Sequence, residues 1–140
     1  MSPRPRGRTQ PCDRASAQQR LRDAQAFLAV ADLVADDGDQ LATPSVTASL
    51  AVLAGIAASD AACCAVLGLR ARGEDHQQAL DLVRENSPDG LAMARDLGRL
   101  LSVKDDAQYG LLGVSAQRAR SARGQARRLF EAADRHVRWR

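Results

Sequence analysis

Aromatic residues are scarce in this 140-residue chain, where Phe27, Tyr109, Phe130 and Trp139 make up 3% of the sequence. A protein that stacks successive bases of a single strand needs several aromatic platforms, so this shortage argues against that class of binder. It also disfavours a β-sandwich with an aromatic core. Alanine is abundant and the apolar residues recur at helical spacing, so the sequence predicts a single all-α domain.

Cysteine is also rare, because the chain has only three: Cys63 and Cys64 are adjacent, and Cys12 is isolated. No pair has the CxxC spacing of a zinc site, and there is no glycine-rich phosphate loop or nucleophile elbow, so we expect neither a metal nor a cofactor. An odd count without a pairing pattern excludes a disulfide framework and indicates a reducing compartment. We therefore expect Cys63 and Cys64 to fill the core.

The N-terminal segment is basic but lacks the apolar stretch of a signal peptide. Residues 1–12 hold three of the five prolines, with polar residues and glycine between the arginines. Such a segment cannot bury enough surface to order itself, so we expect a flexible basic arm over 1–12 and a helical domain over 13–140. Together with the cysteine pattern, this predicts a cytoplasmic protein.

Charge is distributed unevenly along the chain, although the net charge is only +3. Residues 1–14 carry a net charge of +3 and residues 115–140 a net charge of +6, whereas the middle carries −6. Two interpretations remain open. The basic ends could meet phosphates, because a positive field concentrates anions, or they could meet the acidic middle of the same chain or of a second copy.

Helix-start signals divide residues 13–140 into about five helices. Asp13 is a good N-cap for a first helix that ends near residue 35, and Thr43 with Pro44 begins a second. A short third helix spans about residues 76–85, and Ser87 with Pro88 repeats the pattern of cap and first-position proline for a fourth. A polar turn at residues 104–106 precedes a last helix that Ser115 caps. Short connections between these helices predict an antiparallel bundle.

The longest apolar run covers residues 46–69 and contains one strongly polar side chain, Asp60. Its length could span a bilayer, but alanine dominates it and Gly55, Ser59 and Asp60 lie near its middle. We interpret it as the central helix of the bundle rather than a membrane span. A buried, unpaired carboxylate would be costly, so we expect Asp60 to pair with Arg70 or Arg99.

A first polar segment, residues 70–76, could carry chemistry. His76 could move protons, and Arg70 or Arg72 could hold a phosphate through two hydrogen bonds. Asp75 or Glu74 could orient the imidazole ring. A structural interpretation is also open. The arginines would then stabilise the C-terminal end of the second helix, Asp75 would cap the third, and His76 would be a surface residue.

A second polar segment, residues 104–110, lies before the last helix, where connecting loops often carry function. Its candidate binding residues are Lys104, Asp105 and Tyr109. In the structural alternative, the Tyr109 ring packs on the bundle and its hydroxyl forms a hydrogen bond. The last helix adds Arg120 and Arg127, which either form a solvated face or contact an acid or a phosphate.

The order of these features resembles the HEPN superfamily of small helical domains, over roughly residues 20–137. The resemblance is carried by residues 58–62 at the end of the apolar helix, by the Gly-Arg-rich turn that reaches His76, and by residues 104–110 before an alanine-rich last helix. Active members of that superfamily are metal-independent ribonucleases. They use an arginine, four to six intervening residues and a histidine, usually across a dimer interface.

Two segments of this chain match that arrangement in part. Five residues separate Arg70 from His76, but the superfamily usually places the pair before the last helix. There, Lys104 stands for the arginine and Tyr109 for the histidine, with four residues between them. If the second segment is the equivalent one, the catalytic histidine is missing, and the resemblance implies a non-catalytic member that binds nucleic acid, nucleotides or a partner protein.

The sequence thus leads to three functional hypotheses. We favour a non-catalytic HEPN-like module that forms a homodimer and binds RNA or a protein partner, without contact with a membrane. The alternative is a metal-independent ribonuclease of toxin type, in which Arg70 holds the phosphate and His76 transfers the proton. The third is a structural bundle with no ligand. The homodimer is expected because the helices carry more apolar surface than one small bundle needs to hide.

Overall fold

The computed structural model describes residues 8–36, 43–73 and 76–138. Within these residues the chain is an all-α bundle with one small antiparallel sheet, which confirms the predicted fold class. The elements follow one another as β1 (Thr9–Pro11), α1 (Arg14–Asp36), α2 (Pro44–Leu67), β2 (Leu69–Ala71), α3 (His76–Arg84), α4 (Gly90–Gln108) and α5 (Ala116–Arg138).

Three of the helix starts lie where local sequence signals placed them. Asp13 Oδ1 accepts a hydrogen bond of 2.8 Å from the Ser16 amide, Thr43 Oγ1 one of 3.3 Å from the Val46 amide, and Ser115 Oγ one of 3.1 Å from the Arg118 amide. Each cap satisfies an amide that has no partner inside the first turn of its helix.

The limits of α4 differ from the prediction at both ends. The helix begins at Gly90, with Asp89 in the N-cap position, and not at Pro88. It also continues through Lys104, Asp105 and Asp106 to Gln108, where a polar turn was expected. The continuation has a physical cause, because the buried stripe of Leu100, Leu101 and Val103 extends to the partly buried Ala107 on the same side of the helix.

The end of the predicted flexible arm is an ordered strand. Residues 9–11 form β1, which pairs antiparallel with β2 so that Gln10 lies opposite Arg70. The Cys12 amide then donates to the Gly68 carbonyl at 2.9 Å, and the Arg72 amide to the Arg8 carbonyl at 2.7 Å. The expectation of flexibility is therefore wrong for residues 9–12. Residues 1–7 lie outside the described part of the chain.

A disulfide joins Cys12 to Cys64, across a sequence separation of 52 residues. The prediction that the chain forms no disulfide is therefore wrong, and only Cys63 is a free, buried thiol that fills the core. Sequence spacing could not reveal this pairing, because it depends on β1 folding back onto the end of α2. The bond anchors the strand to the central helix.

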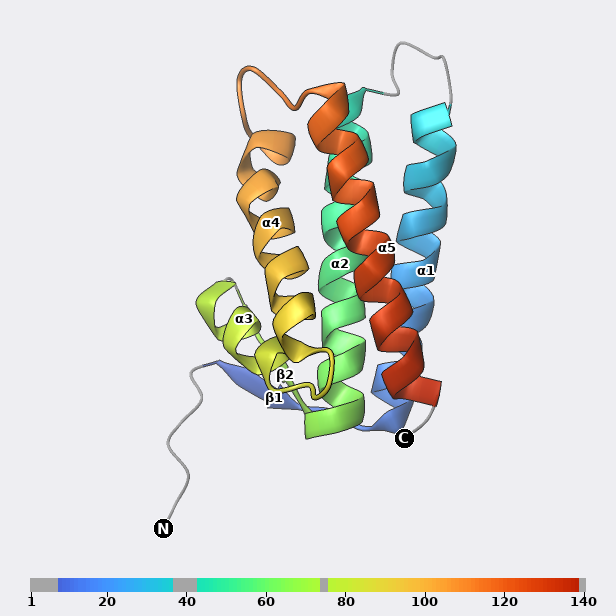
Figure 1. The fold of residues 1–140 in the computed structure, drawn as a ribbon, viewed down its shortest axis with the longest axis vertical. Coiled ribbons are helices and arrows are strands. Elements are labelled where there is room, and N and C mark those ends of the chain that lie inside the picture. Colours follow the sequence, from blue (N-terminus) through green and yellow to red (C-terminus); the bar gives the residue numbers. More distant parts are fainter. Residues whose placement is uncertain (1–7, 37–42, 74–75, 139–140) are drawn as a thin grey trace.

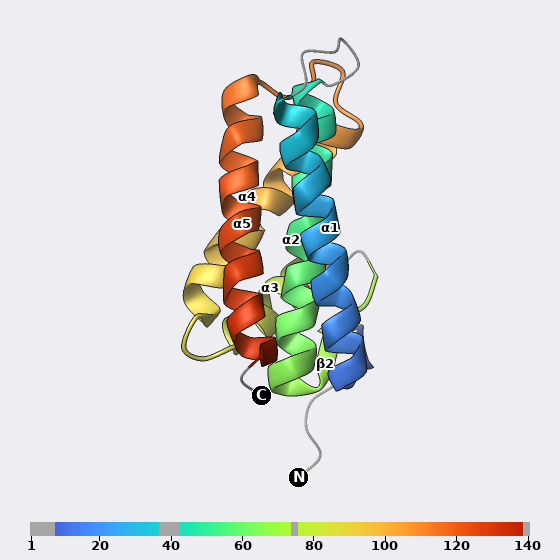
Figure 2. The ribbon, with the colours of Figure 1, turned by 90° about the vertical axis from the view of Figure 1, so that its right-hand side faces the viewer.

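The helix α2 is the axis of the molecule. Figure 1 shows α1 and α4 on either side of it and α5 in front, and Figure 2 shows the same packing from the side. By length and composition α2 could cross a membrane, but two thirds of its most apolar window is buried inside the bundle. Its small side chains let the neighbours approach closely, since a Cβ on Gly55 would overlap Leu100 of α4 and lie 3.2 Å from Leu129 of α5.

The basic last helix is joined to the acidic middle of the chain by ion pairs. Arg123 and Arg127 of α5 both bind Asp32 of α1. Further pairs join Arg128 to Asp96 at 2.8 Å, Arg135 to Asp89 at 3.3 Å, and Arg118 to Asp106 at 3.1 Å. For these arginines the intramolecular interpretation is confirmed, because their carboxylate partners belong to the same chain.

Candidate functional site

Both polar segments of the sequence line one cavity of about 430 Å³, which we call the cationic cavity. It lies between α2 and α4, and α1, β2 and α3 border it. Arg70, Arg72 and His76 reach it from the first segment, and Lys104 and Tyr109 from the second. The fold therefore brings together two groups of residues that lie about thirty positions apart in the sequence.

Positive charge dominates the polar lining of the cationic cavity. Arg20, Arg70, Arg72 and Lys104 line it together with His76, whereas Asp60 is the one acidic side chain among its described lining residues. No described residue accepts a hydrogen bond from the Arg72 guanidinium, which is exposed. An excess of guanidinium and ammonium groups over carboxylates favours an anion inside the cavity.

Asp60 holds two of these cations in place. Its Oδ2 accepts hydrogen bonds from Arg20 Nε at 3.2 Å and Arg20 Nη2 at 3.0 Å, and from Arg70 Nη1 at 3.4 Å. Burial raises the pKa of Asp60 above its usual range, while Arg20 and Arg70 oppose that shift. The predicted pairing with Arg70 is confirmed and that with Arg99 is wrong; Arg20, forty residues away, was missed.

Arg70 is fixed from a second side by the N-terminal strand. Its Nη2 donates to Oε1 of Gln10, the residue opposite it in the β1–β2 pair, at 3.1 Å. A guanidinium that bonds both Gln10 and Asp60 has fewer donors left for a ligand than Arg72 has. Within the cavity, Arg70 therefore shapes the wall, and Arg72 has the more available donors.

Ser59 is a cavity residue that the sequence did not reveal. Its side chain is only 4% exposed, and its hydroxyl has no hydrogen-bond partner among the described residues. A buried hydroxyl without a partner is costly, so one that lines a cavity points to a polar group that occupies the space beside it. The signal in the sequence was a serine next to Asp60 inside an apolar helix, which is too common to be diagnostic.

Apolar side chains also line the cationic cavity. They are Leu53, Ile56, Ala79, Leu97 and Leu101. Tyr109, which caps the C-terminal end of α4, is 77% exposed, so its ring does not pack on the bundle as the structural alternative supposed. The cavity thus has cationic side chains that suit an anion and apolar or aromatic side chains that suit a flat or apolar group.

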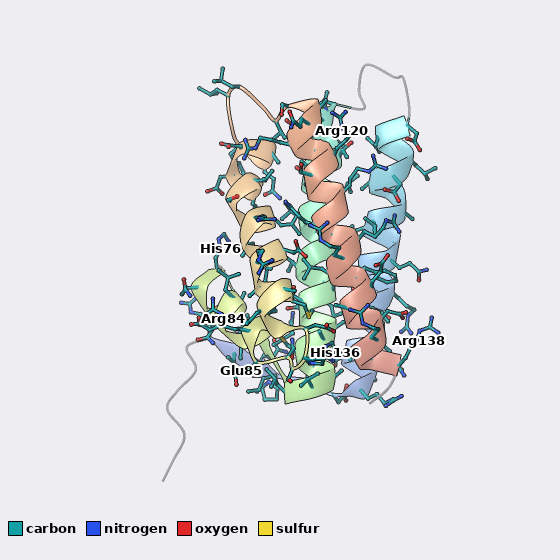
Figure 3. All side chains as sticks on the ribbon, viewed as in Figure 1. His76, Arg84, Glu85, Arg120, His136 and Arg138 are labelled. Atoms are coloured by element: carbon teal, nitrogen blue, oxygen red, sulfur yellow. A yellow bond between two sulfur atoms is a disulfide. The ribbon has the colours of Figure 1, made fainter. Side chains whose placement is uncertain are left out.

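His76 is half-buried at the first residue of α3, where its ring lines the cavity. Figure 3 shows it beside α4, far from Arg120, which lies near the start of α5. Arg120 and Arg127 line a separate hollow with Asp32 and do not reach the cationic cavity. Asp105 is exposed on α4 and is not a lining residue either. Asp75 lies outside the described residues.

Nucleophilic and metal chemistry find little support in the described part of the chain. No group of three or more histidine, cysteine or acidic side chains there could hold a metal ion. Burial raises the pKa of the one free thiol, that of Cys63, to about 12, so it is not an available nucleophile at neutral pH. No protein-family model and no curated protein matches this chain.

Proposed function

We propose that this chain is a non-catalytic, HEPN-like binding module whose cationic cavity takes a phosphate-bearing unit of single-stranded RNA. The convergence of Arg72, His76, Lys104 and Tyr109 on one cavity carries this proposal. The cations suit a phosphate, the exposed Tyr109 ring suits one stacked base, and the Ser59 hydroxyl suits a polar atom of the nucleotide. With one aromatic platform, the module would hold one nucleotide and not a run of stacked bases.

Fluorescence anisotropy with a labelled single-stranded oligoribonucleotide tests this function. We expect Arg72→Ala and Lys104→Ala each to weaken binding by about ten- to a hundredfold, because each removes a charged hydrogen-bond donor. Each should also lower the slope of log affinity against log salt by about 0.7, the effect of one phosphate contact on a single strand.

The matched control is Arg95→Ala, which removes a positive charge from an exposed position of the same helix, α4, outside the cavity lining. We expect it to change the affinity by less than about twofold, because exposed charges act weakly at a distance. Absence of salt-dependent RNA binding by the wild-type protein, or an equal loss in Arg95→Ala and the cavity variants, contradicts the proposal.

A metal-independent ribonuclease is the second candidate, favoured by one observation: Arg70 and His76 line the same cavity. His76 would accept the proton of a ribose 2′-hydroxyl as its oxygen attacks the phosphorus, and an arginine would stabilise the charge that develops on the phosphate. The P–O5′ bond would break, which leaves a 2′,3′-cyclic phosphate, and the departing 5′-oxygen would take up a proton from water. Incubation of structured RNA with a chelator present separates the candidates. Cleavage that His76→Ala abolishes would favour the nuclease, whereas intact RNA bound by the protein favours the binding module.

We also infer that the module is a homodimer that does not enter a membrane. The cytoplasmic location expected from the sequence loses its cysteine argument, because Cys12 and Cys64 form a disulfide. Large apolar side chains remain exposed on α1 and α2, among them Val30, Leu33 and Val46. A symmetric pair would cover such surfaces, and closed dimers are the commonest oligomers. The burial of α2 between its neighbours supports the absence of a membrane span.

A further inference from the structure

A second cavity lies beside the disulfide and shares two residues with the first. This disulfide cavity has a volume of about 620 Å³, and Cys12, Ala15, Arg20 and Arg70 are among the residues that line it. Arg20 and Arg70 also line the cationic cavity. The two cavities therefore meet at the side chains that Asp60 holds. Arg20, which also binds Asp23, and Arg70 are the charged side chains among the described lining residues of the disulfide cavity.

The two sulfur atoms of the disulfide differ in access. Cys12 is half-buried and lines the disulfide cavity, whereas Cys64 is buried inside α2 at 4% exposure. A thiolate that occupies this cavity can reach the Cys12 sulfur but not the Cys64 sulfur. Because Arg20 and Arg70 line this cavity and no acidic side chain is among its described lining residues, a thiol that carries carboxylates can accept hydrogen bonds from their guanidinium groups beside the bond.

The neighbouring free thiol does not compete for this bond. Cys63 is buried, its Sγ accepts a hydrogen bond of 3.5 Å from Asn86 Nδ2, and burial raises its pKa to about 12. It stays protonated at neutral pH, and the protonated thiol is a poor nucleophile in exchange. Exchange at Cys12–Cys64 therefore needs a thiol from solution.

The disulfide is also connected mechanically to the cationic cavity. It anchors β1, a strand of three residues, and β1 pairs with the strand that carries Arg70. Two further hydrogen bonds connect these strands and their flanking residues, in addition to the β1–β2 pairing. One joins Arg70 to Gln10, and the other joins the Arg72 amide to the Arg8 carbonyl. A short two-stranded pair is marginal in water by itself, so loss of the covalent anchor would free β1.

We propose that Cys12–Cys64 is an exchange site for an anionic low-molecular-weight thiol, and that its reduction weakens ligand binding in the cationic cavity. The second half of this inference rests on the proposed RNA-binding function; the first half does not.

The exchange balances as two thiol steps. The thiolate attacks the Cys12 sulfur, the Cys12–Cys64 bond breaks, and the Cys64 sulfur leaves with the electron pair and takes up a proton. The product carries a mixed disulfide at Cys12. A second thiolate then attacks the sulfur of the bound small thiol, which releases the small-molecule disulfide and leaves Cys12 as a thiol, so the protein gains two electrons and two protons in all.

Glutathione, an anionic thiol, is the probe for the exchange site, and 2-mercaptoethanol is the neutral comparison. We expect peptide mapping by mass spectrometry to find the glutathione adduct on Cys12, formed severalfold faster than the 2-mercaptoethanol adduct at equal thiolate concentration. Ala15→Glu adds a negative charge to the lining and should slow glutathione but not 2-mercaptoethanol. Gln18→Glu adds the same charge to α1 outside the lining, and should slow neither.

Other results of these experiments overturn the exchange site. The proposal is refuted if the adduct forms on Cys63 or Cys64, or if the two thiols react at equal rates. It is also refuted if Ala15→Glu and Gln18→Glu have equal effects, or if the disulfide of the folded protein survives treatment with glutathione. None of these readouts involves RNA, so they stand whether or not the proposed function does.

RNA affinity measured with and without dithiothreitol tests the coupling. We expect the reduced wild type to bind about three- to tenfold more weakly, because Arg70 and Arg72 lose the contacts with β1 and Arg8 that fix their positions in the cavity lining. Cys12→Ser should bind like the reduced form in both conditions, and Cys63→Ala should keep the wild-type response. Equal affinity of the oxidised and reduced wild type refutes the coupling, and this comparison needs no variant to fold. RNA binding by neither form refutes the proposed function.

Discussion

Asp60 is the residue on which three elements converge. It lies in α2 and is 8% exposed, and it binds Arg20 from α1 and Arg70 from the segment after α2. Arg20 also binds Asp23 at 3.1 Å, so the two guanidinium groups share two carboxylates at the boundary between the two cavities. The buried carboxylate thus sets the positions of cations that face ligands on both sides.

Asp60→Ala should lower the free energy of unfolding by about 3 kcal/mol, because it leaves Arg70 without a carboxylate partner among the described residues, close to Arg20, which keeps only Asp23. The loss stays below that of a fully buried pair, since both arginine side chains are about a third exposed. Urea denaturation measures it. Asp134→Ala, which breaks an exposed pair with Arg138 within one helix, is the control and should cost less than about 0.5 kcal/mol. Equal losses in the two variants would contradict this role of Asp60.

At the scale of residues, sequence reasoning found the partners that lie near in sequence or share a helix end. The pairing of Asp60 with Arg70 and the cap at Thr43 were both predicted, because each depends on local geometry. The Asp60–Arg20 pair and the unpartnered Ser59 hydroxyl were not predictable. They depend on how α1 and α2 pack, and periodicity alone does not fix which polar side chains then meet.

At the scale of elements, α2 depends on close approach by its neighbours. Gly55 is the tightest position, because a Cβ there would overlap Leu100 Cδ1 and lie 3.2 Å from Leu129 Cδ1. Both leucines are fully buried, so neither can move away without disturbing the core. The glycine therefore serves packing between helices at the expense of intrinsic helix propensity.

Gly55→Ala should destabilise the protein by about 1–3 kcal/mol, since overpacking outweighs the gain in helix propensity. Gly98→Ala is the matched control on α4, where the added Cβ would meet Leu80 Cδ2 at 3.7 Å, an ordinary contact. That variant should be stabilised by up to about 1 kcal/mol. Thermal unfolding followed by circular dichroism compares the two. A Gly55→Ala protein as stable as Gly98→Ala would contradict this account of the packing.

The predicted element boundaries were accurate where a cap and an apolar stripe agreed. Ser87–Pro88 carries the same signal as Thr43–Pro44, but the helix begins later, at Gly90. The chain reverses tightly between α3 and α4, and a Cβ at Gly90 would overlap the Arg84 carbonyl. The packing of α3 against α4 determines where this reversal ends and α4 begins. A two-residue sequence pattern does not predict that packing.

At the scale of the whole molecule, ion pairs join the basic last helix to the acidic middle of the same chain. Most of the described ion pairs of α5 join it to carboxylates of α1, α4 and the turn before α4. The uneven charge in the sequence predicted this as one of two interpretations. The disulfide, in contrast, was excluded by the sequence reasoning because three scattered cysteines show no pairing pattern.

Light scattering coupled to size-exclusion chromatography tests the homodimer. We expect a mass of twice the 15.0 kDa of one chain. Leu33→Lys, which places a charge on an exposed apolar side chain of α1, should shift the protein to the monomer. Leu91→Lys makes the same change at the start of α4 and should not. A wild-type mass of one chain at all concentrations would rule out the dimer.

The alanine-lined axis also governs how this chain can diverge. Ala51, Ala54, Ala58, Ala61 and Ala62 are all fully buried. Almost any replacement there adds atoms to a space with no room for them, whereas a replacement in a leucine-rich interior usually removes atoms. Drift along α2 is thus confined to exchanges among the smallest side chains. Variation should accumulate instead at sites such as Leu111 and Leu112, which nothing in the described structure covers.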